Sequence, residues 1–315
     1  MISGVLLPWL LLGAGIVLLG MGASWLVDGA SRLALLLGIS PMVVGLTVVG
    51  FGTSMPEFTV SVLAASRGST DLSLGNAVGS NIMNLLLVLG VAAVLVPIQV
   101  IGSRRLITRD LVFGLLPAAV LLVCARGGSI SRPTALLLLG IFFVFITTVV
   151  VQARGRVSES AVVRGSPLRH LLITAIGIAV LVAGSEMLVR GGVDLAHRFG
   201  VSEAVIGLTL VAFGTSLPEL ATSVAAVLKG QSDIGVGNVL GSNVFNLGLV
   251  VGTAFTFRPA TVATFVIYQD LPILVGATLL VGLIVIRNGR IGRGEAAGML
   301  ALFTGYIAFV AIRGG

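Results

Sequence analysis

Apolar runs of about 20 residues recur along the whole chain, separated by short polar segments. An α-helix needs about 20 apolar residues to cross the hydrocarbon core of a bilayer, so each run predicts a membrane-spanning helix. Two runs are interrupted by glycine, proline and hydroxyl residues, one at 52–56 and the other at 214–218. We expect ten spans, at 5–36, 41–65, 71–96, 110–125, 133–152, 171–196, 202–229, 233–255, 270–286 and 296–312.

The second half of the sequence repeats the first with an offset of 162 residues. The stretch VVGLTVVGFGTSMPE at Val43 aligns with VIGLTLVAFGTSLPE at Val205. Chance similarity between two apolar segments would not keep polar residues in register, so we interpret the halves as an internal duplication. The pairs kept in register include Glu57 and Glu219, Gly75 and Gly237, Ser80 and Ser242, and Asn84 and Asn246.

Five spans per half is an odd number, so the two halves must enter the membrane in opposite directions. The expected fold is therefore an all-α integral membrane protein with ten transmembrane helices in two inverted-topology five-helix repeats. The first repeat covers 1–152, with its motif at 43–85. A basic cytoplasmic loop covers 153–170, and the second repeat covers 171–315, with its motif at 205–247.

The basic residues of the loops predict the orientation, because cytoplasmic loops carry the excess of lysine and arginine. With both termini outside, twelve basic residues fall inside and seven outside. The inside set is Arg32, Arg104, Arg105, Arg109, Arg154, Arg156, Arg164, Arg169, Lys229, Arg287, Arg290 and Arg293. We therefore expect a multi-pass protein of the plasma (inner) membrane with both termini outside.

Composition supports a membrane protein and excludes other classes. Charged residues make up 10% of the chain, against about 25% in a soluble domain. The net charge of +7 does not indicate a nucleic-acid partner, because these charges lie mostly in loops. Neither histidine lies in an apolar span, and the chain has one cysteine, so a zinc or copper site is not expected.

The two interrupted spans carry the candidate chemistry. Pro56 and Pro218 each remove a helix hydrogen bond, so both helices should break there and free carbonyl oxygens. Within a bilayer, free backbone groups persist only where protein buries them or where they line a wet cavity. Hydroxyl oxygens stand at the same breaks, from Thr53, Ser54, Thr215 and Ser216.

Directly after each break comes an acid, Glu57 or Glu219. A carboxylate in the hydrocarbon region costs about 2.5–3.5 kcal/mol or more, so a cation between the two is expected. Carboxylates, carbonyls, hydroxyls and asparagine amides form an all-oxygen ligand set, which suits hard cations such as Ca²⁺ and Na⁺. One proline kink or one intramembrane asparagine is commonly only structural, but the whole set occurs twice in register.

The segments GNAVGSNIMN at Gly75 and GNVLGSNVFN at Gly237 follow the acids. Their glycines, which include Gly79 and Gly241, should let a neighbouring helix approach closely. Ser80 and Asn84, like Ser242 and Asn246, share one helix face and give each half a polar stripe that can meet the broken helix.

The remaining acids are interpreted as structural. Glu186, Asp28 and Asp194 lie near expected span ends and have no acid at the equivalent position of the other half. Four aspartates, Asp71, Asp110, Asp233 and Asp270, stand at expected helix starts, where an acid caps a helix and interacts with its dipole.

Together GTSMPE with GNAVGSNIMN, and GTSLPE with GNVLGSNVFN, resemble the two alpha repeats of the sodium/calcium exchanger family of the cation/calcium antiporters. The resemblance extends over nearly the whole chain, which is similar to a minimal prokaryotic member of the family. It implies a midplane site with four ion positions between the second, third, seventh and eighth helices. It also implies that the first and sixth helices slide across this core to alternate access.

The resemblance implies a role for each matching residue. Glu57 and Glu219 would be the metal-binding carboxylates, and the backbone of Thr53 and Thr215 would help to bind calcium. Sodium would be bound by the same two acids and by serines on the two sides of the site. The serines are Ser54 and Ser216 on the outward side and Ser80 and Ser242 on the inward side, and the site-lining amides are Asn81, Asn84, Asn243 and Asn246.

One position departs from the family pattern. Family members commonly carry an aspartate where this chain has Asn246, so only two acids remain here. Two carboxylates balance one Ca²⁺ but leave one positive charge against three Na⁺. Stoichiometry and K⁺ dependence therefore stay open.

We expect a secondary active antiporter that exchanges Na⁺ for Ca²⁺, with no cofactor, no nucleic acid and no obligate protein partner beyond the lipid bilayer. H⁺/Ca²⁺ exchange is the alternative, but proton exchangers of the superfamily typically carry GNxxE, and this chain has Gly79 or Gly241 there. K⁺-dependent Na⁺/Ca²⁺ exchange and a cation channel also remain alternatives. An enzyme is not expected, because no histidine in a span could activate a serine.

Overall fold

The computed structural model describes residues 2–99, 104–153, 166–199 and 212–314, which are mostly helical. The α-helices before the central loop are α1 (Ile2–Leu37), α2 (Pro41–Val44), α3 (Gly50–Thr53), α4 (Met55–Ser66), α5 (Thr70–Met83), α6 (Leu89–Leu95), α7 (Arg104–Cys124) and α8 (Arg132–Ala153). Those after it are α9 (Pro167–Arg198), α11 (Ala212–Thr215), α12 (Leu217–Leu228), α13 (Ser232–Val244), α14 (Val251–Phe257), α15 (Leu271–Asn288) and α16 (Arg293–Gly314). Four π-helical segments continue these helices: η1 (Gly45–Val49), η2 (Asn84–Val88), η4 (Phe245–Val250) and η5 (Val266–Asp270).

Seven helical spans in the described ranges are long and apolar enough to cross a membrane, and the bent pair Pro41–Thr53 and Met55–Ser66 adds an eighth. They agree with eight of the ten expected spans. The expected span at 110–125 lies in α7, which begins earlier, at Arg104, with several arginines. Of the expected span at 202–229, the structure describes only 212–229. The count of ten therefore stays a prediction.

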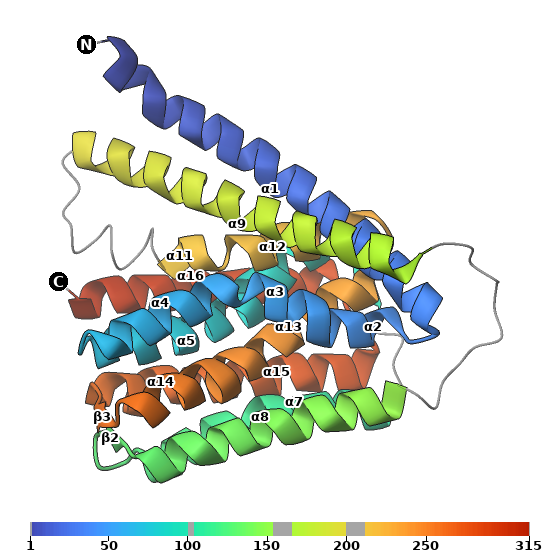
Figure 1. Cartoon of the computed structure of the whole chain (residues 1–315). Coiled ribbons are helices and arrows are strands. Elements are labelled where there is room, and N and C mark those ends of the chain that lie inside the picture. The colour runs from blue at the N-terminus through green and yellow to red at the C-terminus, as the bar shows by residue number, and fades with distance from the viewer. Residues whose placement is uncertain (1, 100–103, 154–165, 200–211, 315) are drawn as a thin grey trace.

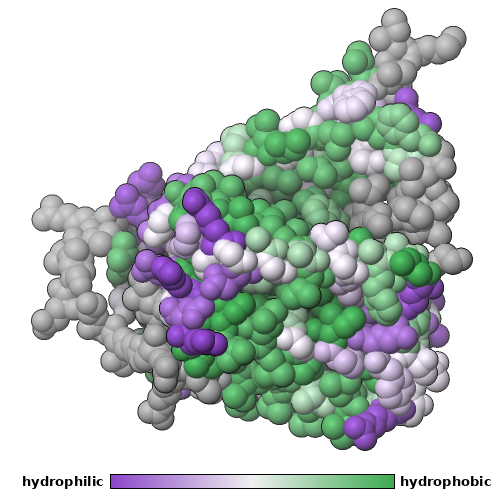
Figure 2. Space-filling model, turned by 180° about the vertical axis from the view of Figure 1, so that it is seen from behind, coloured by the Kyte–Doolittle hydropathy of each residue, from purple (hydrophilic) through white to green (hydrophobic). Residues whose placement is uncertain are grey.

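The outer surface carries a broad apolar band. Figure 2 shows hydrophobic side chains across the middle of the molecule, with hydrophilic residues gathered toward its margins. Large apolar side chains such as Trp9, Leu35, Phe143 and Leu283 are exposed within the spans. A surface of this kind is stable against lipid rather than water, so the chain is a multi-pass membrane protein.

Helices α1 and α9 lie side by side along one side of the molecule, where α1 also packs against α2 and α12 of the stack formed by the other helices (Figure 1). Glycines allow this approach: a Cβ on Gly15 would lie 2.8 Å from the Gly184 carbonyl oxygen, and one on Gly177 would lie 3.0 Å from that of Gly22. The two contacts are equivalent under the 162-residue offset, with the halves exchanged. These glycines therefore let the two helix backbones approach closely.

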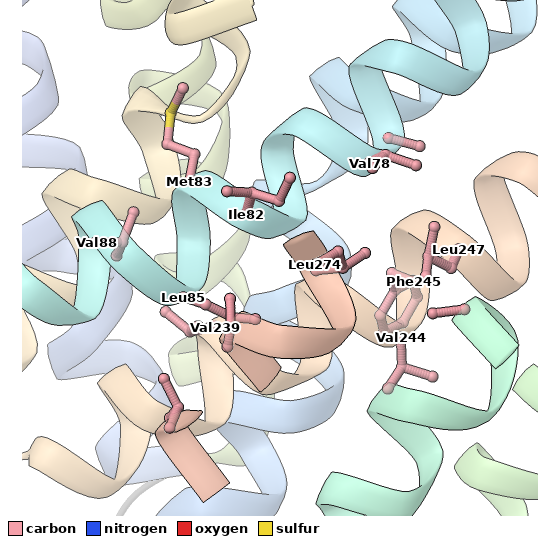
Figure 3. Packing of buried hydrophobic residues seen from close by; sticks show 14 of the residues in the cluster. Val78, Ile82, Met83, Leu85, Val88, Val239, Val244, Phe245, Leu247 and Leu274 are labelled. Carbon is pink, nitrogen blue, oxygen red and sulfur yellow. The ribbon is translucent and has the colours of Figure 1, made fainter. Parts of the chain in front are cut away.

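The core lies between the two central spans, Thr70–Leu95 and Ser232–Phe257, which are the most deeply buried of the seven. Figure 3 shows Val78, Ile82 and Leu85 of the first span near Val239 and Phe245 of the second. The ring of Phe245 also packs edge-on against Phe142 of α8, with ring centroids 4.8 Å apart. This core holds the polar residues of both motifs in fixed positions.

The motif glycines of the second half pack as expected. A Cβ on Gly237 would lie 2.6 Å from the carbonyl oxygen of Met42, and one on Gly241 would lie 2.5 Å from that of Leu46. A Cβ on Gly75 or Gly79 would meet no described atom of a neighbouring segment within 4 Å. The segment equivalent to Met42 and Leu46 lies within 200–211, outside the described residues, so the prediction for these two glycines stays untested.

Two short antiparallel ladders join loops that are distant in sequence. Strand β1 (Ile98–Gln99) pairs with β4 (Arg290–Ile291), and β2 (Ser129–Ile130) pairs with β3 (Ala260–Thr261). Each ladder joins one loop from each half. In the expected topology the two loops of each ladder lie on the same side of the membrane, so the ladders agree with the order of the spans.

The first break forms where the sequence predicts it. Ser54 lies between α3 and α4, and the helix axis bends there by 46°. Pro56 occupies the first turn of α4, where its missing N–H leaves the Gly52 carbonyl without the usual helical donor. The second break is equivalent, with Ser216 between α11 and α12 and Pro218 in the first turn of α12.

Candidate cation site

Glu57 and Glu219 are both fully buried. Each stands in the first turn of the helix that follows a break, Glu57 in α4 and Glu219 in α12. The positive end of the helix dipole stabilises a negative charge at such a position. The proline break therefore creates a helix N-terminus inside the protein and places an acid on it.

Serines from the opposite half bind the two acids. Ser54 Oγ donates to Glu219 Oε1 over 3.1 Å, and Ser216 Oγ donates to Glu57 Oε1 over 3.1 Å. The two bonds exchange under the repeat offset, as residues do across a two-fold axis. The sequence places each serine three residues before its own acid, but in the structure each serves the acid of the other half.

Thr53 and Thr215 lie against the motif helices of the opposite half. Thr53 Oγ1 donates to Asn238 Oδ1 over 2.9 Å, and Thr215 Oγ1 contacts Asn76 Oδ1 at 3.4 Å. The backbone role expected for these two threonines stays a prediction.

Asn76 and Asn238 extend the network away from the break. Asn76 Nδ2 donates to Ser61 Oγ over 2.9 Å, and Asn238 Nδ2 donates to Ser223 Oγ over 3.2 Å. Sequence reasoning did not assign these four residues to the site. A sequence signal was available, because Asn76 and Asn238, like Ser61 and Ser223, are repeated with the same offset of 162 residues.

The inward-side serines differ between the halves. Ser242 Oγ donates to Glu219 Oε1 over 3.3 Å and lies 3.4 Å from Thr53 Oγ1. Ser80 Oγ, its equivalent, is buried without a hydrogen-bond partner among the described residues. The site is therefore symmetric in composition but not in its hydrogen bonds.

Four asparagines of the two central spans bond to one another. Asn84 Nδ2 donates to Asn243 Oδ1 over 3.1 Å, and Asn246 Nδ2 donates to Asn81 Oδ1 over 3.0 Å. Asn81 Nδ2 donates in turn to the Asn243 carbonyl over 2.9 Å, and Asn243 Nδ2 to the Asn81 carbonyl over 3.3 Å. All four expected lining residues are thus brought together.

Buried oxygens without a partner identify where a ligand would bind. Nine buried side-chain atoms in the described ranges have no hydrogen-bond partner, and five of them belong to these residues. Leaving a buried polar group unpaired costs about 1–3 kcal/mol, and more for a charged group. The five are Oε2 of Glu57 and Glu219, Oδ1 of Asn84 and Asn246, and Oγ of Ser80.

The donor set is composed of oxygen alone and suits a hard cation. No group of three or more histidine, cysteine, aspartate or glutamate side chains occurs in the described part of the chain. Two carboxylates, two amide carbonyls and hydroxyls therefore make up this site, and soft or nitrogen-preferring metals have no matching ligands in it.

A family model described as sodium/calcium exchanger protein matches residues 7–151 and 169–312. The chain belongs to the sodium/calcium exchanger family. It is 38% identical over 304 residues to the putative antiporter CaxA of Alkalimonas amylolytica, covering 93% of this chain and 95% of that protein. It is 35% identical to the inner membrane protein YrbG of Escherichia coli (strain K12), covering 98% and 97% of the two chains.

The fold of this exchanger-family chain is similar to a solved one. The sodium-calcium exchanger NCX_Mj, soaked with Na⁺ and Sr²⁺, superposes with a TM-score of 0.84 at 32% identity. The match covers 96% of this chain and 98% of that one. The resemblance inferred from the two motifs is thereby confirmed over both halves.

The acids interpreted as structural lie outside the site. Glu186 forms an i,i+4 ion pair with Arg190, and Asp28 forms an ion pair with Lys229 over 2.7 Å. Asp194 is exposed. None of the three contacts the buried network in the described residues.

The expected helix start at Asp110 is wrong, because Asp110 lies inside α7, which begins at Arg104. Asp270 directly precedes α15, as predicted, but it ends the π-helical segment η5 and makes no capping hydrogen bond. Both acids are buried. Arg109 pairs with Asp110, and Arg313 pairs with Asp270 over 2.9 Å. The paired arginines let the helices extend past these acids, which the hydropathy pattern alone did not indicate. Asp71 and Asp233, in contrast, lie in the first turns of α5 and α13, as predicted.

Proposed function

We propose that this exchanger-family chain is a secondary active antiporter that exchanges Na⁺ for Ca²⁺ by alternating access at the site between its two repeats. The observation that carries this proposal is the pair of buried carboxylates, each with one oxygen bonded across the repeats and the other without a partner in the described residues. A cation between the two halves would supply what both free oxygens lack.

In this proposal Glu57 and Glu219 bind Ca²⁺ together with the backbone carbonyls of Thr53 and Thr215. Each threonine directly precedes the serine of its break, and that serine bonds to the acid of the opposite half. The amide oxygens of Asn84 and Asn246 line the same space. Two carboxylates balance the charge of one Ca²⁺, so the loaded site is neutral at its centre.

Sodium ions use the same two acids together with serines. Ser54 and Ser216 already lie within hydrogen-bond distance of the acids, and Ser242 lies near Glu219. Ser80 has an unpaired hydroxyl that an ion can use. Because both cations need the same carboxylates, calcium and sodium exclude one another, and this competition couples the two fluxes.

The architecture that serves this function is ten helices in two inverted repeats, 1–152 and 171–315, joined by the cytoplasmic loop 153–170. The contacts that exchange under the offset support the two-fold relation. The basic loops support an orientation with both termini outside. Helices α1 and α9, which pack side by side on one side of the central stack, are the elements that would move across it (Figure 1).

Substitution of the acids tests the site. Glu57→Gln and Glu219→Gln keep the side-chain shape and remove one charge each, so both should reduce Na⁺-dependent Ca²⁺ exchange in proteoliposomes to the background level. Glu186→Gln is the matched control, because Glu186 is exposed and pairs only with Arg190 among the described residues. The control should exchange within about twofold of the wild-type rate, since exposed ion pairs contribute little. Full exchange by both site variants would refute the assignment.

A further inference from the structure

The four asparagines form a crossed arrangement that the helix pattern does not suggest. Asn81 and Asn84 are three residues apart on one helix, yet each bonds to the opposite half. Asn84 bonds to Asn243, and Asn246 bonds to Asn81. The pairs that share a hydrogen bond are therefore separated by 159 and 165 residues in the sequence.

The side chains of Asn81 and Asn243 are fixed by backbone groups. Each donates its amide nitrogen to the main-chain carbonyl of the other, over 2.9 Å and 3.3 Å. Both carbonyls lie at the change from α-helix to π-helix, since η2 begins at Asn84 and η4 at Phe245. An amide with its nitrogen fixed on one side must present its oxygen on the other.

This fixed oxygen determines the orientation of the next asparagine. Asn81 Oδ1 can only accept, so it binds the nitrogen of Asn246, and Asn243 Oδ1 binds that of Asn84 in the same way. The oxygens of Asn84 and Asn246 are left buried and without a partner in the described part of the chain. Those two oxygens are the ones a cation would need.

We propose that Asn81 and Asn243 are positioning residues of the cation site, each holding the amide of the asparagine from the other repeat so that Asn84 and Asn246 present oxygen to the ion. A free amide could rotate and present its N–H groups, which repel a cation. The crossed bonds therefore keep two neutral ligands in the state that a cation requires. This inference rests on the site of the proposed function, but it concerns ion binding and not the coupling ion.

A double-mutant cycle on equilibrium Ca²⁺ binding, measured by titration calorimetry of the whole protein without Na⁺, tests the crossing. Asn81→Ala should weaken Ca²⁺ binding by about 10–100-fold, as loss of a partner that orients a metal ligand commonly does. In an Asn246→Ala background the same substitution should have no further effect. The pair Asn243 and Asn84 should behave equally.

The matched control uses residues of the same helix. Asn81→Ala in an Asn84→Ala background, and Asn243→Ala in an Asn246→Ala background, should still weaken Ca²⁺ binding by the full factor. The melting temperature of each ion-free variant is measured as well. A purely structural role would lower the melting temperature without this crossed pattern in the affinities.

If the alanine variants do not fold, Asn81→Ser and Asn243→Ser, which keep a small polar group, are used in the same cycles. Coupling within each helix instead of across the repeats, or additive effects for every pair, would overturn the inference. A wild-type protein that binds Ca²⁺ with crossed coupling but exchanges it without Na⁺ would refute the proposed function and leave this inference standing.

Discussion

At the residue scale, the two buried acids have too few hydrogen-bond donors to stabilise two negative charges. Glu57 and Glu219 each have one oxygen bonded to a serine and the other unpaired within the described residues. The serine bonds stabilise the charged form, because a hydrogen bond to a charged group contributes about 1.5–3 kcal/mol. Burial of each carboxylate still costs several kcal/mol. The remaining cost favours a cation between the two repeats, and neutral Asn246 makes these two acids the only charges of the described site.

Asn246→Asp adds a third carboxylate at the family's usual position and should strengthen Na⁺ binding. Two unit charges about 4 Å apart interact by about 4 kcal/mol at an effective dielectric constant of 20, and desolvation offsets much of this. We expect the Na⁺ concentration for half-maximal exchange to fall about tenfold. Flux measured against Na⁺ concentration in proteoliposomes checks the value.

The same substitution should make exchange more sensitive to acid, because protons would compete with cations for the added carboxylate. The wild-type side chain is an amide and cannot titrate. Asn84→Asp, at the equivalent position, is the matched comparison. Identical Na⁺ dependence and pH profiles in wild type and Asn246→Asp would contradict the assignment of Asn246 to the site.

The chain's duplicated motifs predicted a set of polar residues that the structure links by hydrogen bonds, but not their pairing. The acids, serines and asparagines were singled out because they recur in register. Their partners could not be predicted, since helical spacing places Ser54 near Glu57 and says nothing about which residue of the other half approaches. For the same reason the threonine contacts with Asn76 and Asn238 were missed.

At the element scale, the breaks depend on backbone groups that proline leaves unpaired. Pro218 cannot donate to the Gly214 carbonyl, and Ser185 of α9 donates to that carbonyl instead over 2.5 Å. The first half has Ala23 at the position equivalent to Ser185, which has no hydroxyl. The second break is therefore attached to α9 by a hydrogen bond that the first half cannot form.

The sequence predicted both breaks from their prolines. It did not predict the π-helical segments that contain Asn84 and Asn246, because these segments have no comparable residue signature.

Ser185→Ala should destabilise the protein, because the buried Gly214 carbonyl then loses its donor. The expected cost is about 1–3 kcal/mol. Thr174→Val is the matched control, since Thr174 is buried in the same helix. Among the described residues its hydroxyl bonds only to the carbonyl of His170, four residues earlier in that helix. Thermal unfolding of detergent-solubilised protein, followed by size-exclusion chromatography, compares the two. Equal melting temperatures would show that the bond does not hold α9 at the break.

Gly22→Ala should weaken the contact between α1 and α9. A Cβ there would lie 2.7 Å from the Leu181 nitrogen and 2.9 Å from the Gly177 oxygen, and neither backbone atom can move alone. Overpacking of this kind costs about 1–3 kcal/mol. The melting temperature in detergent measures it.

Gly20→Ala is the matched control for that substitution. A Cβ at Gly20 would meet no described atom within 4 Å. Its melting temperature should stay at or above that of wild type, because alanine favours the helix over glycine by up to about 1 kcal/mol. Equal losses in Gly20→Ala and Gly22→Ala would contradict close packing by glycine as the basis of the contact.

At the scale of the whole molecule, symmetric contacts coexist with an asymmetric position of α1 and α9. The bonds from Ser54 and Ser216 to the acids exchange between the halves, as do the bonds among the asparagines. In contrast, α9 alone contacts both breaks in these described contacts, with Ile178 against Gly52 and Val189 against Gly214. Lys229 ties α1 to the end of α12 through Asp28 and Ser24. The duplicated motifs predicted membership of the exchanger family and a membrane-spanning helical fold, but a symmetric sequence pattern cannot indicate on which side α1 and α9 lie.

Coupling of Ca²⁺ to Na⁺ through Glu57 and Glu219 is tested by uptake of radiolabelled Ca²⁺ into proteoliposomes under separately imposed Na⁺, K⁺ and H⁺ gradients. We expect Ca²⁺ to accumulate against its gradient when Na⁺ flows outward, and not to accumulate when a pH gradient is imposed without Na⁺. Accumulation driven by the pH gradient alone, or Ca²⁺ flux that only follows its own gradient, would contradict it.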